Sequence, residues 1–424
     1  MNKSLVKWVF ILLLAGIMLS ACGQASTQAK SDAARVLQPD IPAGTLDTLV
    51  AGDNRFALDL YQSLRASGDN LFYSPFSISL ALGMTYAGAR GVTGAQMADV
   101  LHFDLPQNEL HPAFNQLDLN LASSGEAENE NQQPMQLNIV NAVWGQQGYP
   151  FLPEYLDLLA LNYGAGINLA DFTTQAEPVR EEINQWVSDQ TQERIQDLLA
   201  PGVVDASTRM VLVNAIYFKA DWQDQFDANN THQAPFYLLD GTDVTVDMMA
   251  DNMFLPYLRG ENFQAVELPY AGGSAVMDII MPDEGQFAAF EAALDWSSLE
   301  AILAAMQPVD MYLSMPKFTF SSDFELAPML AGMGMPDAFC AGAADFSGMD
   351  GTGSLCISNV IHQAFVAVDE KGTEAAAATA VVMEESAMIF TGLELPIDHP
   401  FIFLIRDLDS GQILFAGRVL DPGQ

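Results

Sequence analysis

A long segment near the C-terminus, VDEKGTEAAAATAVVMEESAMIFTGLELPIDHPF, separates a strand pattern that ends near Val368 from another that begins near Phe401. A connection of about 30 residues inside a compact domain is usually functional or disordered. Its stretch GTEAAAATAVV has no single preference, because its alanines favour helix and the β-branched residues after them favour strand. In strand register the face of Thr373, Ala375 and Ala377 is small and uncharged. The segment is therefore suited to becoming an added strand in a packed sheet.

The rest of the chain mixes helical and strand patterns. Apolar residues at helical spacing predict a helix over 181–200, and a hairpin over 399–419 is predicted to turn at 409–411. Further strands are predicted at 210–220, 263–270, 276–282 and 310–318. Because helices cluster early and strands cluster late, the pattern predicts an α+β fold. No second linker or internal repeat is evident, so residues 46–424 are predicted to form one domain.

The N-terminus has the features of an export signal. Lys3 and Lys7 precede an apolar run that is too short to span a bilayer comfortably. The residues LSAC that end at Cys22 resemble the bacterial lipobox, whose cysteine is lipidated; the alternative is an ordinary signal peptide with a chance cysteine. We therefore predict a lipoprotein signal peptide over 1–21 and a lipidated, flexible tether over 22–45. The protein would be exported and lipid-anchored to the membrane of a bacterial cell envelope, facing the periplasm or the extracellular space.

The charge balance excludes several classes of partner. The chain has 16 Lys+Arg against 54 Asp+Glu, a formal net charge of −38. So acidic a protein should repel nucleic acid and anionic lipid headgroups. No cluster of basic residues exists that could bind a heparin-type activator.

A search for catalytic and metal-binding motifs finds none. GxSxG, HExxH and GxxxxGK[ST] are absent, and the five histidines lack metal-ligand spacing. No cofactor, metal site or catalytic residue is predicted. Only Cys340 and Cys356 remain in the domain, and in an exported protein we expect them to form a disulfide; the alternative is two unpaired buried thiols.

Several motifs together resemble those of the serpins, inhibitors that insert a cleaved reactive loop into a β-sheet. The resemblance covers about 46–424 and is that of a bacterial serpin with a lipoprotein signal peptide. It implies three β-sheets, about nine α-helices and an exposed loop near the C-terminus. The motifs, in serpin order, are NLFYSPFSISLALGMTYAGARGVT, LVNAIYFKADW, VELPY, MPKFTF, MGMPDAFCAGAADFSGM, EKGTEAAAAT and HPFIFLIRD with ILFAGRVLDP.

The resemblance assigns three groups of residues. The hinge, from which the loop enters the sheet, would comprise Glu370, Gly372, Thr373, Glu374, Ala375, Ala376, Ala377 and Ala378. The shutter, a buried polar cluster where the sheet parts, would comprise Ser74, Ser77, Asn214 and His362. The breach, where the loop first enters, would comprise Trp222 and the pair Lys317 and Glu370.

The resemblance also implies a mechanism. A target protease would attack the loop, and insertion from Thr373 onward would trap the covalent acyl-enzyme. Serpin spacing puts the reactive bond between Ser386 and Ala387, with Met383, Met388, Ile389 and Phe390 as alternates. These residues suit an elastase-, subtilisin- or chymotrypsin-like endopeptidase. The protein would then be a monomeric inhibitor and not an enzyme; the alternatives are a non-inhibitory serpin that acts as a surface binding protein and an unrecognised hydrolase.

Overall fold

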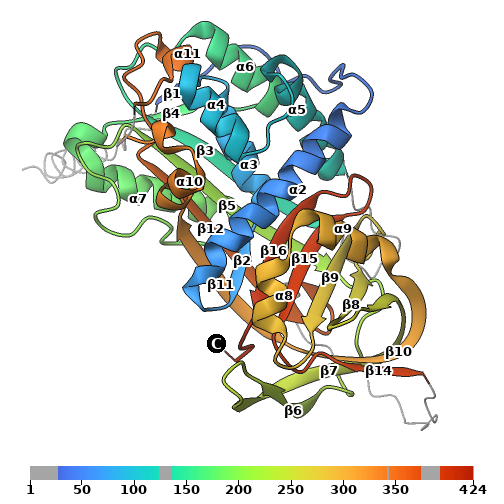
Figure 1. Cartoon of the computed structure of the whole chain (residues 1–424). Coiled ribbons are helices and arrows are strands. Elements are labelled where there is room, and N and C mark those ends of the chain that lie inside the picture. The colour runs from blue at the N-terminus through green and yellow to red at the C-terminus, as the bar shows by residue number, and fades with distance from the viewer. Residues whose placement is uncertain (1–26, 124–134, 341–342, 374–391, 424) are drawn as a thin grey trace, which may run out of the picture.

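The computed structural model describes residues 27–123, 135–340, 343–373 and 392–423 (Figure 1). Among these residues no helix is long and apolar enough to cross a membrane. The helices are α2 (Thr45–Leu64), α3 (Pro75–Tyr86), α4 (Gly91–Val100), α5 (Gln107–Ser123), α6 (Pro153–Tyr163), α7 (Phe172–Gln190), α8 (Phe287–Ala293), α9 (Trp296–Ala305), α10 (Ala327–Met333) and α11 (Ser347–Asp350), with short 3-10 turns η1 (Arg65–Ser67) and η2 (Pro336–Ala338).

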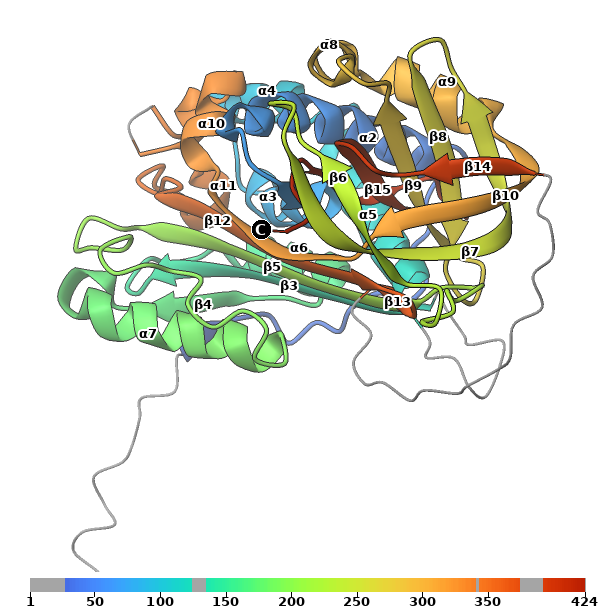
Figure 2. The same ribbon diagram turned by 90° about the horizontal axis from the view of Figure 1, so that it is seen from below.

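The first sheet, which we call sheet A, has the strand order β1-β4-β3-β5-β13-β12-β11. Its central strand β5 is buried along almost its whole length, because α3 packs on one face of the sheet and α7 covers the other (Figure 2). A strand covered on both faces needs a nearly continuous apolar run, which is the pattern that predicted it. The strands are β1 (Thr27–Ala29), β3 (Gln136–Gln146), β4 (Ile167–Ala170), β5 (Met210–Asp221), β11 (Phe318–Glu325), β12 (Asn359–Asp369) and β13 (Gly372–Thr373).

The second sheet has nine strands in the order β14-β10-β7-β8-β9-β15-β16-β2, with β6 paired to β7. Strand β7 pairs with β10 and β6 and, at its far end, with β8, so two of the three expected sheets are continuous through it. The α+β prediction is confirmed. The strands are β2 (Leu71–Tyr73), β6 (His232–Tyr237), β7 (Asp243–Arg259), β8 (Phe263–Pro269), β9 (Ala275–Pro282), β10 (Gln307–Pro316), β14 (Leu393–Pro396), β15 (Phe401–Asp407) and β16 (Ile413–Val419).

The helix predicted over 181–200 is wrong in its second half. Helix α7 ends at Gln190, and Gln192 and Glu193 then have left-handed φ values of 52° and 63°. Ile195 and Leu199 are nevertheless buried in the small core between α7 and sheet A. The helical spacing of these apolar residues therefore arose from their burial in a turn-rich segment. The helix itself does not continue through them.

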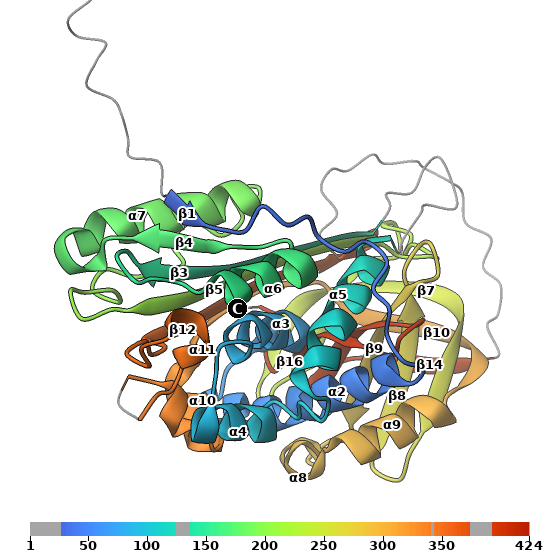
Figure 3. The same cartoon turned by 90° about the horizontal axis from the view of Figure 1, so that it is seen from above.

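The predicted tether over 22–45 is wrong for residues 27–45, which are docked on the domain. Strand β1 extends sheet A by pairing antiparallel with β4 (Figure 3). Arg35 then donates to the side chain of Asn115 at 2.7 Å and forms a 2.6 Å ion pair with Asp118, both on α5. A Cβ at Gly166 would lie 2.7 Å from the carbonyl oxygen of Ala29, so the glycine permits this close approach. An open sheet edge and an anchoring arginine thus order a segment whose composition suggested flexibility.

We predict that Arg35→Ala lowers the free energy of unfolding by about 2 kcal/mol, because it removes two charge-assisted hydrogen bonds from a partly buried position. The matched control is Arg259→Ala, whose side chain is 49% exposed in its ion pair with Asp283, and we expect it to cost at most about 1 kcal/mol. Urea unfolding followed by tryptophan fluorescence measures both. Equal effects of the two substitutions would contradict the docking of the segment.

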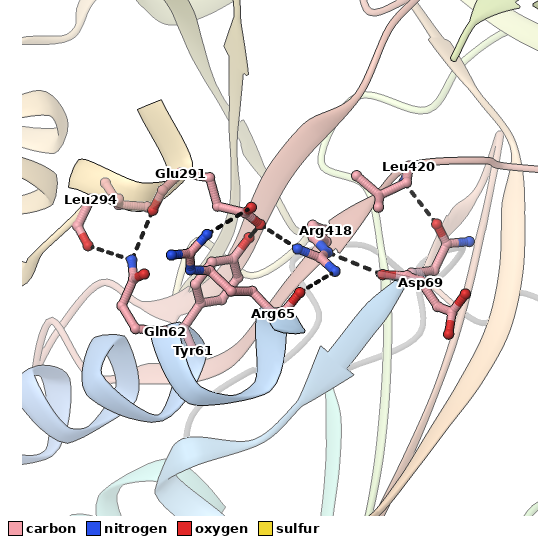
Figure 4. A network of polar contacts seen from close by, with 9 residues as sticks. Tyr61, Gln62, Arg65, Asp69, Glu291, Leu294, Arg418 and Leu420 are labelled. Atoms are coloured by element: carbon pink, nitrogen blue, oxygen red, sulfur yellow. Dashed lines mark hydrogen bonds and ion pairs between the residues drawn. The ribbon is translucent and has the colours of Figure 1, made fainter. Parts of the chain in front are cut away.

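A buried polar network fixes the C-terminal strand to the helices (Figure 4). Arg418 on β16 forms a 2.6 Å ion pair with Glu291 on α8, and both side chains are buried. Tyr61 on α2 donates to the same carboxylate at 2.8 Å, and Arg418 also donates to the carbonyl oxygens of Arg65 and Asp69. The network links β16, α2 and α8, and its buried charges are paired and hydrogen-bonded.

Candidate functional site

Two central strands of sheet A, β5 and β12, pair directly with each other at one end of the sheet but not at the other. Strands β5 and β12 pair in parallel from Val211 opposite Asn359 as far as Ile216 opposite Ala364. Beyond that point β13 lies between them and pairs antiparallel with both. Thr373 is opposite Val368 on one side and Ala220 on the other. The described chain after β12 therefore turns back and already enters the space between the two central strands (Figure 2).

The two described residues of β13 fit this space closely. A Cβ at Gly372 would lie 2.1 Å from the carbonyl oxygen of Ala220, so no larger residue is accommodated without movement of β5. Glycine is required here by close approach, since Gly372 is not among the glycines with positive φ. The Thr373 side chain is buried, and its hydroxyl lies 2.6 Å from the hydroxyl of Tyr270. The predicted hinge residues 374–378 lie outside the described residues.

The structure brings together the predicted breach residues at the same end of sheet A. Lys317 donates to Glu370 at 2.9 Å, and Thr231 donates to the other oxygen of that carboxylate at 2.8 Å. Burial alone would raise the pKa of Glu370, but these hydrogen bonds outweigh it and hold the pKa below its ordinary value. Glu370 is thus an anion that fixes the turn between β12 and β13.

Trp222 secures the other side of this turn. Its ring stacks on Tyr270 at a centroid distance of 4.6 Å, and its indole N–H donates to the carbonyl oxygen of Asp369. Its backbone N–H donates to the carbonyl oxygen of Lys371. Sequence reasoning missed Tyr270 and Thr231, whose contacts depend on distant strands; only the position of Tyr270 in the VELPY motif drew attention to its segment.

The four predicted shutter residues form one buried cluster where β5 and β12 are still paired. The backbone N–H of Ser74 donates to Nε2 of His362, so Nδ1 carries the proton and donates to the Asn214 side-chain oxygen. Asn214 in turn donates to the Ser77 hydroxyl at 2.5 Å. Asn141 on β3 also bonds Asn214 and Ser77, and the sequence did not single it out. The cluster therefore links three strands of sheet A to the start of α3.

Burial lowers the pKa of His362 from 6.5 to about 3. A depressed folded-state pKa means that the stabilisation is complete above pH 6.5 and is lost as the pH falls toward 3. We predict that the stability advantage of the wild type over His362→Gln shrinks by about 1.4 kcal/mol for each pH unit below 6.5. Urea unfolding between pH 7.5 and 4.5 measures it. The exposed His232→Gln serves as the control, and parallel pH profiles for wild type and His362→Gln would contradict the neutral, buried imidazole.

Of the remaining predicted sites, the structure describes the cysteine pair but not the reactive bond or the lipidation residue. Cys340 and Cys356 are joined by a disulfide with a Cα–Cα distance of 4.9 Å, which links the end of η2 to the segment before β12. The reactive-bond residues 383 and 386–390 and the lipidation residue Cys22 lie outside the described residues. Within the described ranges no group of three His, Cys, Asp or Glu side chains is placed to hold a metal ion.

This chain is similar to known proteins over most of its length. Residues 51–422 match the family model described as "Serpin (serine protease inhibitor)". The leukocyte elastase inhibitor of Xenopus laevis is 38% identical over 89% of this chain and 100% of its own length. An uncharacterised serpin-like protein of Thermococcus kodakarensis is 40% identical over 87% of this chain and 84% of its own. Among solved structures, the thermophilic serpin tengpin in its native state is 27% identical with a TM-score of 0.80, covering 93% of this chain and 100% of that one.

Proposed function

Because this chain belongs to the serpin family, we propose that it inhibits a protease as a suicide substrate, by inserting its cleaved loop into sheet A. The observation that carries this proposal is the position of Gly372 and Thr373. They already lie between β5 and β12 and run antiparallel to both, in the direction that a longer inserted strand would follow. The fit of Gly372 against β5 explains why the chain keeps glycine there.

The register of β13 indicates what insertion must break. If the strand continued without a bulge, Thr379 would lie opposite His362 on one side and Asn214 on the other. It would therefore separate the two side chains that now hydrogen-bond to each other across the closed part of the sheet. We infer that the shutter cluster holds sheet A closed until cleavage releases the loop, and that a threonine hydroxyl replaces part of the lost bonding.

The energetics favour a trap. About 12 newly paired residues, at roughly 1 kcal/mol of net hydrogen bonding each, would offer on the order of 10 kcal/mol. A gain of that size can outweigh the cost of distorting the protease and its oxyanion hole before water releases the acyl-enzyme. The uncleaved fold would then be kinetically trapped above a more stable inserted state.

We propose an elastase-, subtilisin- or chymotrypsin-like serine endopeptidase as the target. The segment from 372 to 405 contains no Lys or Arg, so a protease that requires a basic residue before the cut is disfavoured. The proposed reactive bond is Ser386–Ala387, and the elastase-inhibitor name of a similar protein agrees with a small residue at that position.

We also propose that the mature protein is a monomer held at the bacterial cell envelope by lipid on Cys22. If so, the docked segment 27–45 brings the anchor close to the β1 edge of sheet A, because only residues 23–26 separate Cys22 from β1. A chain of five peptide steps spans at most about 17 Å. The inhibitor would therefore be held close to the membrane with this edge toward it.

Incubation of the purified domain with elastase, subtilisin and chymotrypsin tests the function. We expect an SDS-resistant complex with at least one of them, and mass spectrometry of the released C-terminal peptide locates the bond. Cleavage without a complex would instead indicate a non-inhibitory serpin, and hydrolysis of a chromogenic ester would indicate an enzyme.

A further inference from the structure

An exposed aromatic residue breaks the alternation of strand β7. When one face of an antiparallel sheet packs on the core, the other face normally carries polar residues. The exposed residues in the first half of β7 follow this rule, because they are Asp243, Thr245 and Asp247. Further along the strand, the position exposed between two buried residues is Phe254, which is 64% exposed. Departures from such local rules are expected at functional surfaces.

Phe254 belongs to a continuous face that three neighbouring strands form (Figure 2). It lies opposite Asp310 on β10. Tyr312, two residues further along β10, lies opposite Glu394 on β14. Residues that are paired across strands, or two apart along one strand, point to the same side of a sheet. The four side chains therefore share one face, which we call the β7–β10–β14 face.

The charge of this face has one sign. Asp310 and Glu394 are both exposed, and neither forms an ion pair with another described residue. The stretches 250–256, 308–314 and 393–396, which form the face and its surroundings, contain no Lys, Arg or His. An exposed aromatic ring flanked by unpaired carboxylates fits a partner surface that is both basic and apolar.

The β7–β10–β14 face also lies close to the chain that carries the proposed reactive bond. Leu393 at the start of β14 is opposite Met311, which is opposite Met253, the neighbour of Phe254. Because adjacent strands are about 4.8 Å apart, Phe254 lies about 10 Å from Leu393. Only residues 388–392 separate the proposed bond from β14, and such a connection spans at most about 20 Å. A protease domain, with a radius of about 20 Å, would then lie within reach of this face.

We propose that the β7–β10–β14 face is an accessory docking surface for the target protease, which contacts it through a basic and apolar patch beside its active-site cleft. This inference rests on the proposed inhibition of a protease and adds a source of selectivity outside the loop. Docking would bury the ring of Phe254, and the two carboxylates would speed the encounter with a cationic surface. Because this contact forms before cleavage, it should change the rate of association and leave the later insertion into sheet A unchanged.

The second-order rate constants for inhibition of elastase, subtilisin and chymotrypsin test this inference. Phe254→Thr should slow the inhibition of at least one of them by about tenfold, because truncation of an aromatic anchor has effects of this size. The stoichiometry of inhibition should stay the same. Tyr237→Thr is the matched control, since Tyr237 is an aromatic residue, 49% exposed, paired with Asp243 at the other end of β7, and its rates should stay within about twofold.

Two results of these measurements would overturn the docking surface. One is a set of three unchanged rate constants in Phe254→Thr. The other is a changed stoichiometry with an unchanged rate, because it would place the role of Phe254 in insertion.

The carboxylates are tested by the salt dependence of the same rate. The double variant Asp310→Asn with Glu394→Gln should inhibit about threefold more slowly in 50 mM NaCl, and its rate should fall less steeply as salt is added. Asp243→Asn with Asp323→Asn is the control, because it removes the same charge from exposed positions on β7 and β11 outside the face. Equal effects of the two double variants would mean that only net charge matters and would contradict the placement of the acids at the interface.

A non-covalent measurement separates this inference from the proposed function. Failure of the wild type to form an SDS-resistant complex would overturn the proposed function. Surface plasmon resonance with elastase, subtilisin and chymotrypsin whose catalytic serine is replaced by alanine does not need that complex, and Phe254→Thr should weaken the binding of at least one by about tenfold. Equal binding of wild type and Phe254→Thr to all three would overturn the docking surface alone. A wild type that sediments as a dimer, with a monomeric Phe254→Thr, would overturn it in favour of contact between two copies of the chain.

Discussion

Thr373→Arg should turn the protein from an inhibitor into a substrate. Thr373 is fully enclosed between β5 and β12, with its hydroxyl bonded to that of Tyr270. An arginine at this position would have to bury its guanidinium in a space that now encloses a threonine, which would cost at least about 2 kcal/mol and would keep β13 out of the sheet. In the proposed mechanism, insertion passes through this position first, whereas the protease would contact the loop beyond it. Binding and cleavage should therefore persist while trapping fails.

The measurement is the stoichiometry of inhibition together with the SDS-resistant complex on a gel. For Thr373→Arg we expect the inhibitor needed per protease to rise at least about tenfold, and the complex to be replaced by cleaved protein. Thr373→Ser is the control, because it keeps the hydroxyl that contacts Tyr270 and should inhibit normally. Normal inhibition by the arginine variant would show that the trap does not depend on entry beside Tyr270.

Cleavage of the loop should raise the melting temperature by about 10 °C or more. The inserted strand would add on the order of 10 kcal/mol of hydrogen bonding and apolar burial, and each kcal/mol is expected to raise the Tm of a domain this large by about 1 °C. Limited proteolysis between residues 374 and 391 produces the cleaved form. Differential scanning calorimetry of the intact and cleaved proteins gives the comparison.

Cleaved Thr373→Arg is the internal control, because its loop is severed but should not insert. We expect this form to melt within about 3 °C of the uncleaved variant. If cleaved wild-type protein melted at the same temperature as the intact protein, no stored free energy would exist to drive the trap. The covalent complexes of the first experiment would then need another explanation.

Individual elements show why some sequence expectations were correct and others were wrong. The strand at 210–220 and the hairpin at 399–419 were predictable, because an apolar run with β-branched residues and a Gly-containing turn specify them locally. The segment 27–45 was mistaken for a tether, because its order depends on a distant strand edge and on Asp118, which composition does not reveal. Residues 191–200 were mistaken for helix, because the apolar residues that this turn-rich segment buries happen to be spaced as in a helix.

The residues of the candidate site were likewise only partly predictable from the sequence. The motifs identified Ser74, Ser77, Asn214 and His362 as a group, but Asn141 joins them only because β3 pairs with β5 and sets it opposite Asn214. The motifs placed Gly372 in the hinge, but only the structure shows that the carbonyl of Ala220 leaves no space for a side chain there. Contacts of this kind arise between residues far apart in the chain, so a single sequence does not report them.

The sequence by itself determined the fold class and the small, uncharged face of the segment after Gly372, since local propensity and alternation encode them. The family resemblance came from its motifs. Only the tertiary structure decided that β5 and β12 part where β13 enters and that His362 is a neutral donor to Asn214. These properties depend on strand register and burial, which are set when distant segments pack against one another.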